Sequence, residues 1–396
     1  MSNKETGKIL ITGATGYIGG RLLKALDAAG YQIRCMARNP KVLAGRVGSH
    51  IEIVEGDVFL PEALSAALTG IDTAYYNIHS LGGPGDFEER DKEAARNFAM
   101  AAEAAGVKKI VYLGGLGKGP DLSKHLASRQ EVGKKLASGK TPCLEFRASI
   151  VIGSGSLSFE MVRALVEKLP VMTTPRWVRT LAQPIAIENI IEYLTRAAEY
   201  QPEGHEIFEI GGADRISYEG IMRTYAQIRN LKRLIIPVRF LTPGLSSHWL
   251  ALVTPLYAKV GRWLIDGVQN ETIVTDNRAE QIFDVKPMGI DEAIRRALEN
   301  EDRETAETHW SDSLGQLDSD GHYGGERHGS RLVYSRSTRV PVPPEEAFLP
   351  IQYIGGHTGW YSYPWMWSLR GLLDRIGGGV AGKRGRRDPL ILLPGD

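Results

Sequence analysis

Short apolar runs separated by amphipathic stretches occupy the first 155 residues of the chain. Such alternation is typical of parallel strands joined by crossover helices. Two stretches, 21–30 and 87–106, carry apolar residues at three-and-four spacing, and each ends in a glycine suited to a left-handed helix cap. The pattern predicts an α/β fold with a doubly wound parallel Rossmann sheet. Its strand candidates are KILIT (8–12), YQIRCMA (31–37), IEIVEG (51–56), DTAYYNIH (72–79), KKIVYLGG (108–115) and CLEFRASIVIG (143–153).

The pattern loosens after residue 155, where the nucleotide-binding part (1–155) is expected to end. We expect residues 156–300 to form a small substrate-capping region. Residues 301–330 are polar, acidic and rich in glycine, which predicts a linker. Residues 331–396 are then a partial C-terminal module, an α+β extension that begins with a strand and a helix in RLVYSRSTRVPVPPEEAF. The capping segments are SLSFEMVRALVEKLP, a strand in QPIAI leading into a helix from Glu188, the strand HEIFEIGG and a helix from Ser217.

Composition restricts the kinds of partner. Lys and Arg number 48 against 47 Asp and Glu, so no net charge favours nucleic acid, and a small-molecule substrate is expected instead. Cys35 and Cys143 lack metal-ligand spacing, which predicts no metal site and fits a reducing cytoplasm. The amino terminus lacks the apolar stretch of a signal peptide, so we expect a cytoplasmic protein. Composition does not define the oligomeric state.

One segment has the apolar character of a membrane helix. Residues 240–258, FLTPGLSSHWLALVTPLYA, carry no formal charge but contain Pro243 and Pro255. A membrane-spanning helix is one interpretation. We favour a buried or pocket-lining helix, because a spanning helix tolerates these residues poorly, and we therefore expect no integral membrane segment.

The sequence GATGYIGG, residues 13–20, directly follows the first predicted strand and precedes the first predicted helix. In this context the first glycine permits a tight turn, the second lets a pyrophosphate approach the backbone, and the third allows close packing of helix on strand. The free N–H groups and the positive end of the helix dipole bind the phosphate charge. The predicted pyrophosphate loop comprises Gly13, Thr15, Gly16, Tyr17, Ile18 and Gly19.

The segment after the glycine loop indicates the dinucleotide. NAD-binding proteins place an acidic residue about 20 residues beyond the glycines, but no Asp or Glu occurs from Ala28 to His50. Arg38 ends the second strand and could bind the 2′-phosphate of NADP(H). The alternative is a solvated surface cation. Asp57 and Val58 follow the third strand and are expected to border the adenine.

The glycine loop, GDV at 56–58 and RASIVIG at 147–153 resemble the atypical, NmrA-like branch of the extended short-chain dehydrogenase/reductases. The resemblance covers residues 7 to about 300. TGWYSYPW (358–365) and LRGLLDR (369–375) are similar to the start of a domain of unknown function fused to bacterial members.

The resemblance implies a catalytic Ser or Thr after the fifth strand, then a Tyr, and a Lys four residues later. Here the fifth strand runs into Gly114 and further glycines, so the hydroxyl is absent, and Gly114 is expected to border the cofactor. HLASR, residues 125–129, stands where Tyr-x-x-Ser-Lys would fall. His125 could exchange a proton near neutral pH, and Arg129 could hold the nicotinamide ribose. The alternatives are a surface histidine in a non-catalytic protein and a surface ion pair.

His79 and Tyr76, near the end of the fourth strand, are two further candidates for the catalytic site, although each could equally be a packed or capping residue. The sequence thus predicts an NADP(H)-dependent oxidoreductase acting on a small carbonyl, enone or quinone substrate. The alternative is a non-catalytic NADP(H)-binding redox sensor or assembly factor. Loss of the Ser and Tyr favours this alternative, and retention of His125 and Arg129 favours the enzyme.

Overall fold

The structure, a computed structural model, divides the chain into two compact units, residues 1–336 and 337–396. The division falls between Arg336 and Ser337, inside the range 331–396 predicted as the C-terminal module. The residues that the structure describes are 7–44, 47–78, 87–119, 121–238, 269–302, 322–328, 331–336 and 342–353.

A seven-stranded parallel sheet forms the centre of the first unit, in the order β11-β6-β5-β4-β1-β2-β3. The chain winds outward from β1 in one direction and from β4 in the other, which is the doubly wound Rossmann topology. The fold class predicted from the sequence is confirmed. The strands are β1 (Ile9–Thr12), β2 (Ile33–Ala37), β3 (Glu52–Glu55), β4 (Thr73–Tyr76), β5 (Lys109–Gly115), β6 (Cys143–Ala148) and β11 (Glu206–Ile210).

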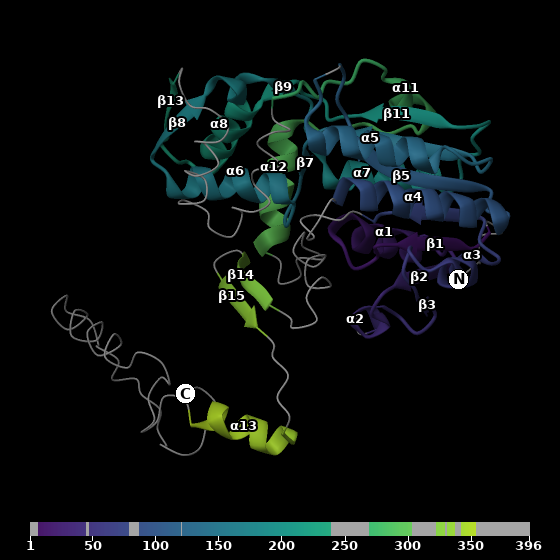
Figure 1. Ribbon diagram of the computed structural model, residues 1–396. Helices are drawn as coiled ribbons and strands as arrows, with labels where there is room; N and C mark the ends of the chain where they lie inside the picture. The colour runs from purple at the N-terminus through teal and green to yellow at the C-terminus, as the bar shows by residue number, and fades with distance from the viewer. Residues whose placement is uncertain are drawn as a thin grey trace. The chain divides into compact units, whose positions relative to one another are not determined.

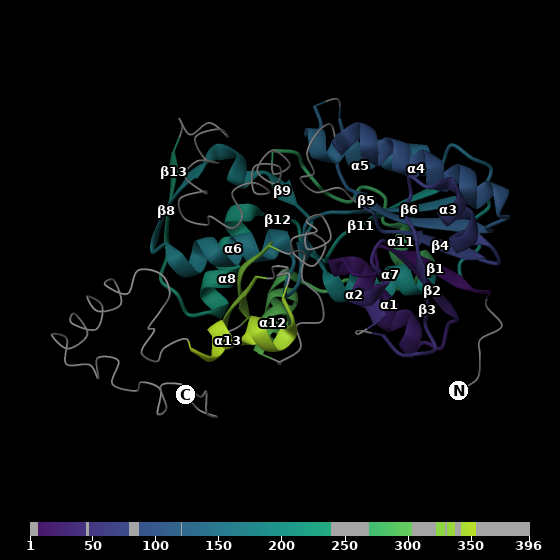
Figure 2. The ribbon, with the colours of Figure 1, turned by 60° about the horizontal axis from the view of Figure 1, so that its bottom comes forward.

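Helices cover both faces of this sheet (Figures 1 and 2). Ile9 and Ile11 point into one apolar core and Leu10 points into the other, since successive strand residues face opposite sides. Burial of both faces is typical of parallel sheets. The helices α1 (Tyr17–Ala28), α7 (Ile187–Ala197) and α11 (Arg278–Ile282) close the first core. The helices α3 (Pro61–Leu68), α4 (Phe87–Ala104) and α5 (Lys124–Leu136) close the second. The short helix α2 (Pro40–Ala44) connects β2 to β3 along the chain.

Glycine caps end α1 and α4, as the sequence predicts. Gly30 and Gly106 have φ of +83° and +72°. The next residue in each case, Tyr31 or Val107, donates its N–H to the carbonyl five residues earlier, at 3.2 and 3.0 Å. These caps turn the chain back into β2 and β5.

A third apolar core lies outside the sheet (left in Figure 1). The predicted strand 143–153 divides here, because the chain leaves β6 at Ser149 and then pairs with a capping strand. HEIFEIGG, expected in the cap, forms β11 and extends the main sheet beside β6. The elements around this core are α6 (Leu157–Lys168), β7 (Val151–Ile152), β8 (Val171–Pro175), η1 (Arg176–Arg179), β9 (Leu181–Ala182), β10 (Ile185–Ala186), β12 (Ile216–Ser217), α8 (Tyr218–Ile228), β13 (Leu234–Val238) and α12 (Ile290–Asp302).

An antiparallel pair, β14 (His322–His328) and β15 (Arg331–Arg336), ends the first unit. β14 therefore lies in the range predicted as a linker. In the second unit the described element is α13 (Pro344–Gln352), which agrees with the predicted strand followed by a helix. The aromatic motifs at 358–365 and 369–375 lie outside the described residues.

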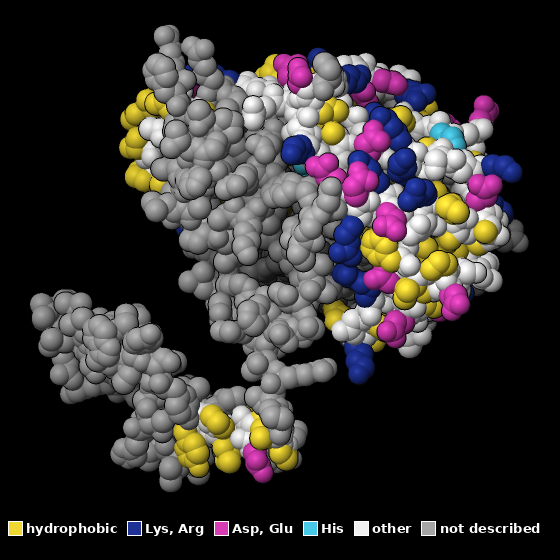
Figure 3. Space-filling view, viewed as in Figure 1, with side chains coloured by type: hydrophobic (Ala, Val, Ile, Leu, Met, Phe, Trp, Pro, Cys, Tyr) yellow, Lys and Arg dark blue, Asp and Glu magenta, His cyan; other side chains and the backbone are white. Residues whose placement is uncertain are grey.

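The described helices include none with the length and apolar character needed to cross a membrane, and residues 240–258 lie outside the described ranges. Figure 3 shows cations and carboxylates interspersed on the visible face of the nucleotide-binding part. Apolar side chains gather at the upper left of Figure 3, over β8 and β13. The exposed large apolar residues of these two strands are Val171, Leu234 and Ile236.

Candidate functional site

The loop between β1 and α1 has the geometry of an anion-binding turn. Gly16 donates its N–H to the carbonyl of Gly13 at 3.0 Å, and α1 starts at Tyr17. Gly16, as the N-cap residue, supplies no side-chain acceptor for the first-turn N–H groups of α1. Such groups bind phosphate oxygens, assisted by the helix dipole. The Tyr17 side chain is buried against Gly153, so its contribution to a nucleotide would come from its backbone N–H.

Two of the three motif glycines occupy positions where a side chain has no room. A Cβ on Gly19 would lie 2.2 Å from the carbonyl oxygen of Gly13, which shows how closely α1 approaches the loop. Gly13 has φ of +65°, and a Cβ there would lie 2.4 Å from the carbonyl oxygen of Asn77. The loop is therefore fixed against both its own helix and the end of β4.

A threonine joins the ends of β1 and β4 beside this loop. The Thr12 hydroxyl donates to the carbonyl of Tyr75 at 3.0 Å and accepts from the N–H of Asn77 at 3.1 Å. These strands flank the point where the winding direction reverses, which is where doubly wound sheets bind their ligands. The Asn77 side-chain amide nitrogen is buried and has no hydrogen-bond partner among the described residues. The sequence analysis did not select Asn77, because an Asn after a strand carries no distinctive signal.

The ends of β2 and β3 hold the residues predicted to bind the adenosine. Arg38 directly follows β2, is exposed, and pairs with no carboxylate or carbonyl among the described residues. Arg34, by contrast, binds Glu52 at 2.9 Å and the carbonyl of Thr69 at 2.8 Å. Asp57 accepts the N–H of Phe59 at 3.0 Å, and its neighbour Val58 is buried. Arg38 is thus an exposed cation at the end of β2 for which the described residues provide no ion pair or hydrogen bond.

His125 lies in the first turn of α5 and is half-buried. Ser123 caps this helix through its hydroxyl, which accepts the N–H of Leu126 at 3.3 Å. The N–H of Ser123 binds the side chain of Asn270 at 2.9 Å, and Asn270 in turn binds the carbonyl of Asp121 at 2.8 Å. Contacts with a distant part of the chain thus fix the helix start that carries His125.

Arg129, one turn along α5, is engaged by the sheet. Its guanidinium donates to the carbonyl of Leu113 and lies 5.4 Å from the centre of the Tyr112 ring. The Tyr112 hydroxyl donates to the carbonyl of Arg129 at 3.0 Å. These contacts dock α5 on β5. The predicted binding of the nicotinamide ribose by Arg129 would have to occur alongside them.

Tyr76 is 1% exposed and lies in the core beneath α4, with its ring 5.1 Å from that of Phe98. Burial raises the pKa of Tyr76 well above its ordinary value, which keeps the phenol protonated. This position is that of a packed residue, the alternative left open by the sequence. His79 lies outside the described residues.

A buried carboxylate lies beneath α5 and was missed by the sequence analysis. Glu145 on β6 binds Arg147 at 2.8 Å, and its side chain is 5% exposed. A Cβ on Gly114 would lie 2.5 Å from one Glu145 oxygen, and a Cβ on Gly133 would lie 2.4 Å from the other. The glycines at 114 and 133 therefore make room for this carboxylate.

A polar network ties the cap to the ends of β6 and β11. Ser149 shares a hydrogen bond of 2.7 Å with Thr272. Gln183 is buried, donates to the carbonyl of Gly212 at 2.7 Å and accepts the N–H of Val274 at 3.1 Å. Buried polar side chains that are fully bonded in this way hold segments in one arrangement.

Comparison with known proteins gives curated relatives that share part of this chain. A ceramide reductase of Caulobacter vibrioides is 27% identical over 177 residues, which are 43% of this chain and 55% of that protein. A photosystem II assembly factor of Cyanophora paradoxa is 32% identical over 105 residues, which are 26% of this chain and 33% of that protein. The chain thus spans about half of the first relative and a third of the second.

Solved structures match the fold of this chain over more of its length than the curated relatives match its sequence. The triphenylmethane reductase of Citrobacter sp., complexed with NADP(H), superposes with a TM-score of 0.59 and 18% identity, covering 73% of this chain and 99% of that one. The NADPH-dependent quinone oxidoreductase of Escherichia coli, complexed with NADPH, gives 0.57 and 20%, covering 72% and 98%. A family model described as NAD(P)H-binding matches residues 13–140. This match, on the glycine loop at the switch point of the sheet, identifies residues 13–140 as an NAD(P)H-binding domain.

Proposed function

We propose that the protein is an NADP(H)-dependent oxidoreductase that transfers a hydride to a small carbonyl, enone or quinone substrate. The observation that carries the proposal is the loop from Gly13 to Gly19 at the topological switch point, with the exposed cation Arg38 at the end of β2, where the ribose would lie. Residues 156–300 would supply much of the substrate side.

The bound nucleotide would supply the hydride, and the chain would orient it and provide a proton donor. His125 is the residue we propose for the donor, because the first turn of α5 is fixed by Ser123 and Asn270. A neutral imidazole donates one hydrogen bond but releases a proton reluctantly. We therefore expect activated acceptors such as quinones or enones to react faster than simple ketones.

A non-catalytic redox sensor or assembly factor is the second candidate. The end of β5 supports it, since residues 114–117 supply none of the hydroxyls that the resemblance implies after the fifth strand. The similarity to a photosystem II assembly factor over 105 residues supports it as well. A screen for NADPH oxidation across quinone, enone and ketone acceptors distinguishes the two, because a sensor would reduce none of these acceptors with NADPH at a useful rate.

NADPH is expected to bind at least about tenfold more tightly than NADH, a difference of about 1.4 kcal/mol. The 2′-phosphate would gain charge-assisted hydrogen bonds from Arg38 that a hydroxyl cannot form. Arg38→Ala should abolish the preference by weakening NADPH binding alone. Titration of both nucleotides by isothermal calorimetry measures it.

Lys41 provides the matched control, because it is an exposed cation three residues after Arg38, in the first turn of α2. Lys41→Ala should retain the preference for NADPH. Equal affinities of the parent protein for both nucleotides, or an Arg38→Ala variant that keeps the preference, would count against Arg38 as the 2′-phosphate ligand.

A further inference from the structure

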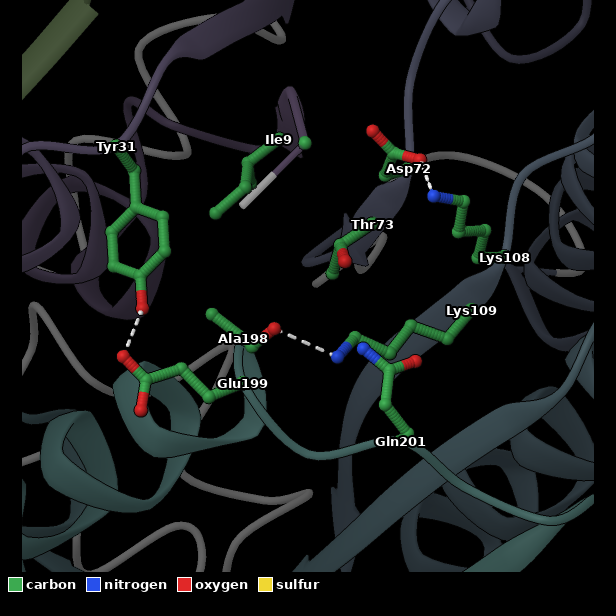
Figure 4. Close-up of a pocket in the computed structure, with 10 residues that line it drawn as sticks. Ile9, Tyr31, Asp72, Thr73, Lys108, Lys109, Ala198, Glu199 and Gln201 are labelled. Atoms are coloured by element: carbon green, nitrogen blue, oxygen red, sulfur yellow. Dashed lines mark hydrogen bonds and ion pairs between the residues drawn. The ribbon is translucent and has the colours of Figure 1, made fainter. Parts of the chain in front are cut away.

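A cavity of about 240 Å³ lies at the amino ends of the central strands, on the opposite edge of the sheet from the glycine loop. It is lined by Ile9, Thr73 and Lys109, which start or lie near the start of β1, β4 and β5, and by Ala198 and Glu199 after α7. Figure 4 shows the Lys109 side chain reaching between Ala198 and Gln201. A water molecule needs only about 10–15 Å³ of such volume, so the cavity has room for a small organic molecule.

Lys109 is 1% exposed, which is rare for a lysine without a carboxylate partner. Its ammonium nitrogen donates to the carbonyl of Ala198 at 2.8 Å and to the carbonyl of Tyr200. Both carbonyls follow the last turn of α7, where helices leave acceptors unsatisfied. Lys109 therefore caps α7 and uses two of its three N–H bonds.

The two hydrogen bonds to the carbonyls also fix the direction of the third position on the Lys109 nitrogen. A neutral amine has two hydrogens and one lone pair, so it can keep both bonds to the carbonyls after losing its third proton. The lone pair then takes the remaining tetrahedral position, on the side of the cavity. The two hydrogen bonds by which Lys109 caps α7 therefore also hold its nitrogen in a position to act as a nucleophile.

Among the described residues, no carboxylate forms an ion pair with Lys109. Asp72 pairs with Lys108 at 2.6 Å, and Glu199 accepts the hydroxyl of Tyr31 at 3.1 Å (Figure 4). Burial lowers the pKa of Lys109 to about 8, and the charge of Glu199 opposes this shift. At pH 7.5 about a quarter of Lys109 is then neutral, against about 0.1% of a lysine with the ordinary pKa of 10.4.

We propose that Lys109 is a site of acylation by a small activated acyl compound that enters this cavity. The lone pair attacks the acyl carbon, a C–N bond forms, the leaving group departs with its bonding electron pair, and the nitrogen gives one proton to water. The product is a neutral amide, which suits a buried site better than the ammonium ion does. It keeps one N–H, so one of the two carbonyls after α7 loses its donor.

Trace labelling of the full chain with acetic anhydride, quantified by peptide mass spectrometry between pH 6 and 10.5, tests this proposal. A second isotopic label added in urea gives the reference for each lysine. Lys140, whose side chain is 93% exposed, is the internal control. We expect Lys109 to be labelled in the native state with a midpoint near pH 8, and to exceed Lys140 at pH 7.

Lys109→Arg serves as the matched variant, because it keeps donors for both carbonyls but removes the nucleophile. Fragment ions that separate residue 109 from the exposed Lys108 should show no label at residue 109, while Lys108 and Lys140 keep their rates. Labelling of Lys109 only after unfolding would overturn the proposal. So would a native-state midpoint above pH 10, since the nitrogen would then be an ordinary amine.

Discussion

Gly13→Ala is expected to raise the Kd for NADPH by more than about a hundredfold. Residue 13 has φ of +65°, and an alanine Cβ would lie 2.4 Å from the carbonyl oxygen of Asn77. The loop must therefore move away from β4, and its N–H groups move with it. Loss of two charge-assisted hydrogen bonds to phosphate costs about 1.5–3 kcal/mol each, and 1.4 kcal/mol is a factor of ten.

Gly106→Ala is the matched control for this variant. Its φ is +72°, but a Cβ there meets nothing within 4 Å. Both variants should lose about 1–2 kcal/mol of unfolding free energy for the left-handed conformation, measured by urea denaturation. The collision with Asn77 should make the loss larger in Gly13→Ala, and Gly106→Ala should bind NADPH like the parent. An unchanged nucleotide affinity in folded Gly13→Ala would show that this loop does not hold the phosphates.

The central sheet could be predicted from the sequence because its determinants are local. Each strand reads as an apolar run, and glycine caps at Gly30 and Gly106 mark the helix ends. The placement of β11 could not be predicted in this way. Its sequence, EIFEI, reads as a short strand, but nothing near it in the chain shows that it pairs with β6. Pairing partners far apart in the sequence leave no local pattern.

The same distinction between local and long-range determinants applies to the candidate site. The motif of the glycine loop spans eight residues, 13–20, so its spacing in the sequence locates it. The surroundings of Arg129 and Tyr76, by contrast, depend on how helices pack on the sheet. Arg129 contacts the carbonyl of Leu113 on β5, and Tyr76 contacts the ring of Phe98 on α4. Glu145 is the clearest case, because the glycines that accommodate it come from β5 and α5. A carboxylate in a strand gives no sign that two distant glycines leave space for it.

Turnover of the best acceptor is expected to fall about a hundredfold to ten-thousandfold in His125→Ala, the usual contribution of a general acid. The affinity for NADPH should stay within a few fold, because the phosphate contacts lie on the loop before α1. Stopped-flow measurement of NADPH oxidation under single-turnover conditions separates the chemical step from nucleotide release.

His125→Gln distinguishes proton transfer from simple polarisation of the acceptor. Glutamine keeps an N–H donor but has no titratable group, so turnover near that of His125→Ala would assign a transferred proton to His125. A rate near the parental one would instead make His125 a hydrogen-bond donor that polarises the carbonyl. His50→Ala controls for loss of an imidazole, since His50 is exposed and binds Asp27 at 2.6 Å on the surface of α1. If His125→Ala, like His50→Ala, turns over at the parental rate, the start of α5 has no catalytic role and the sensor function becomes the better explanation.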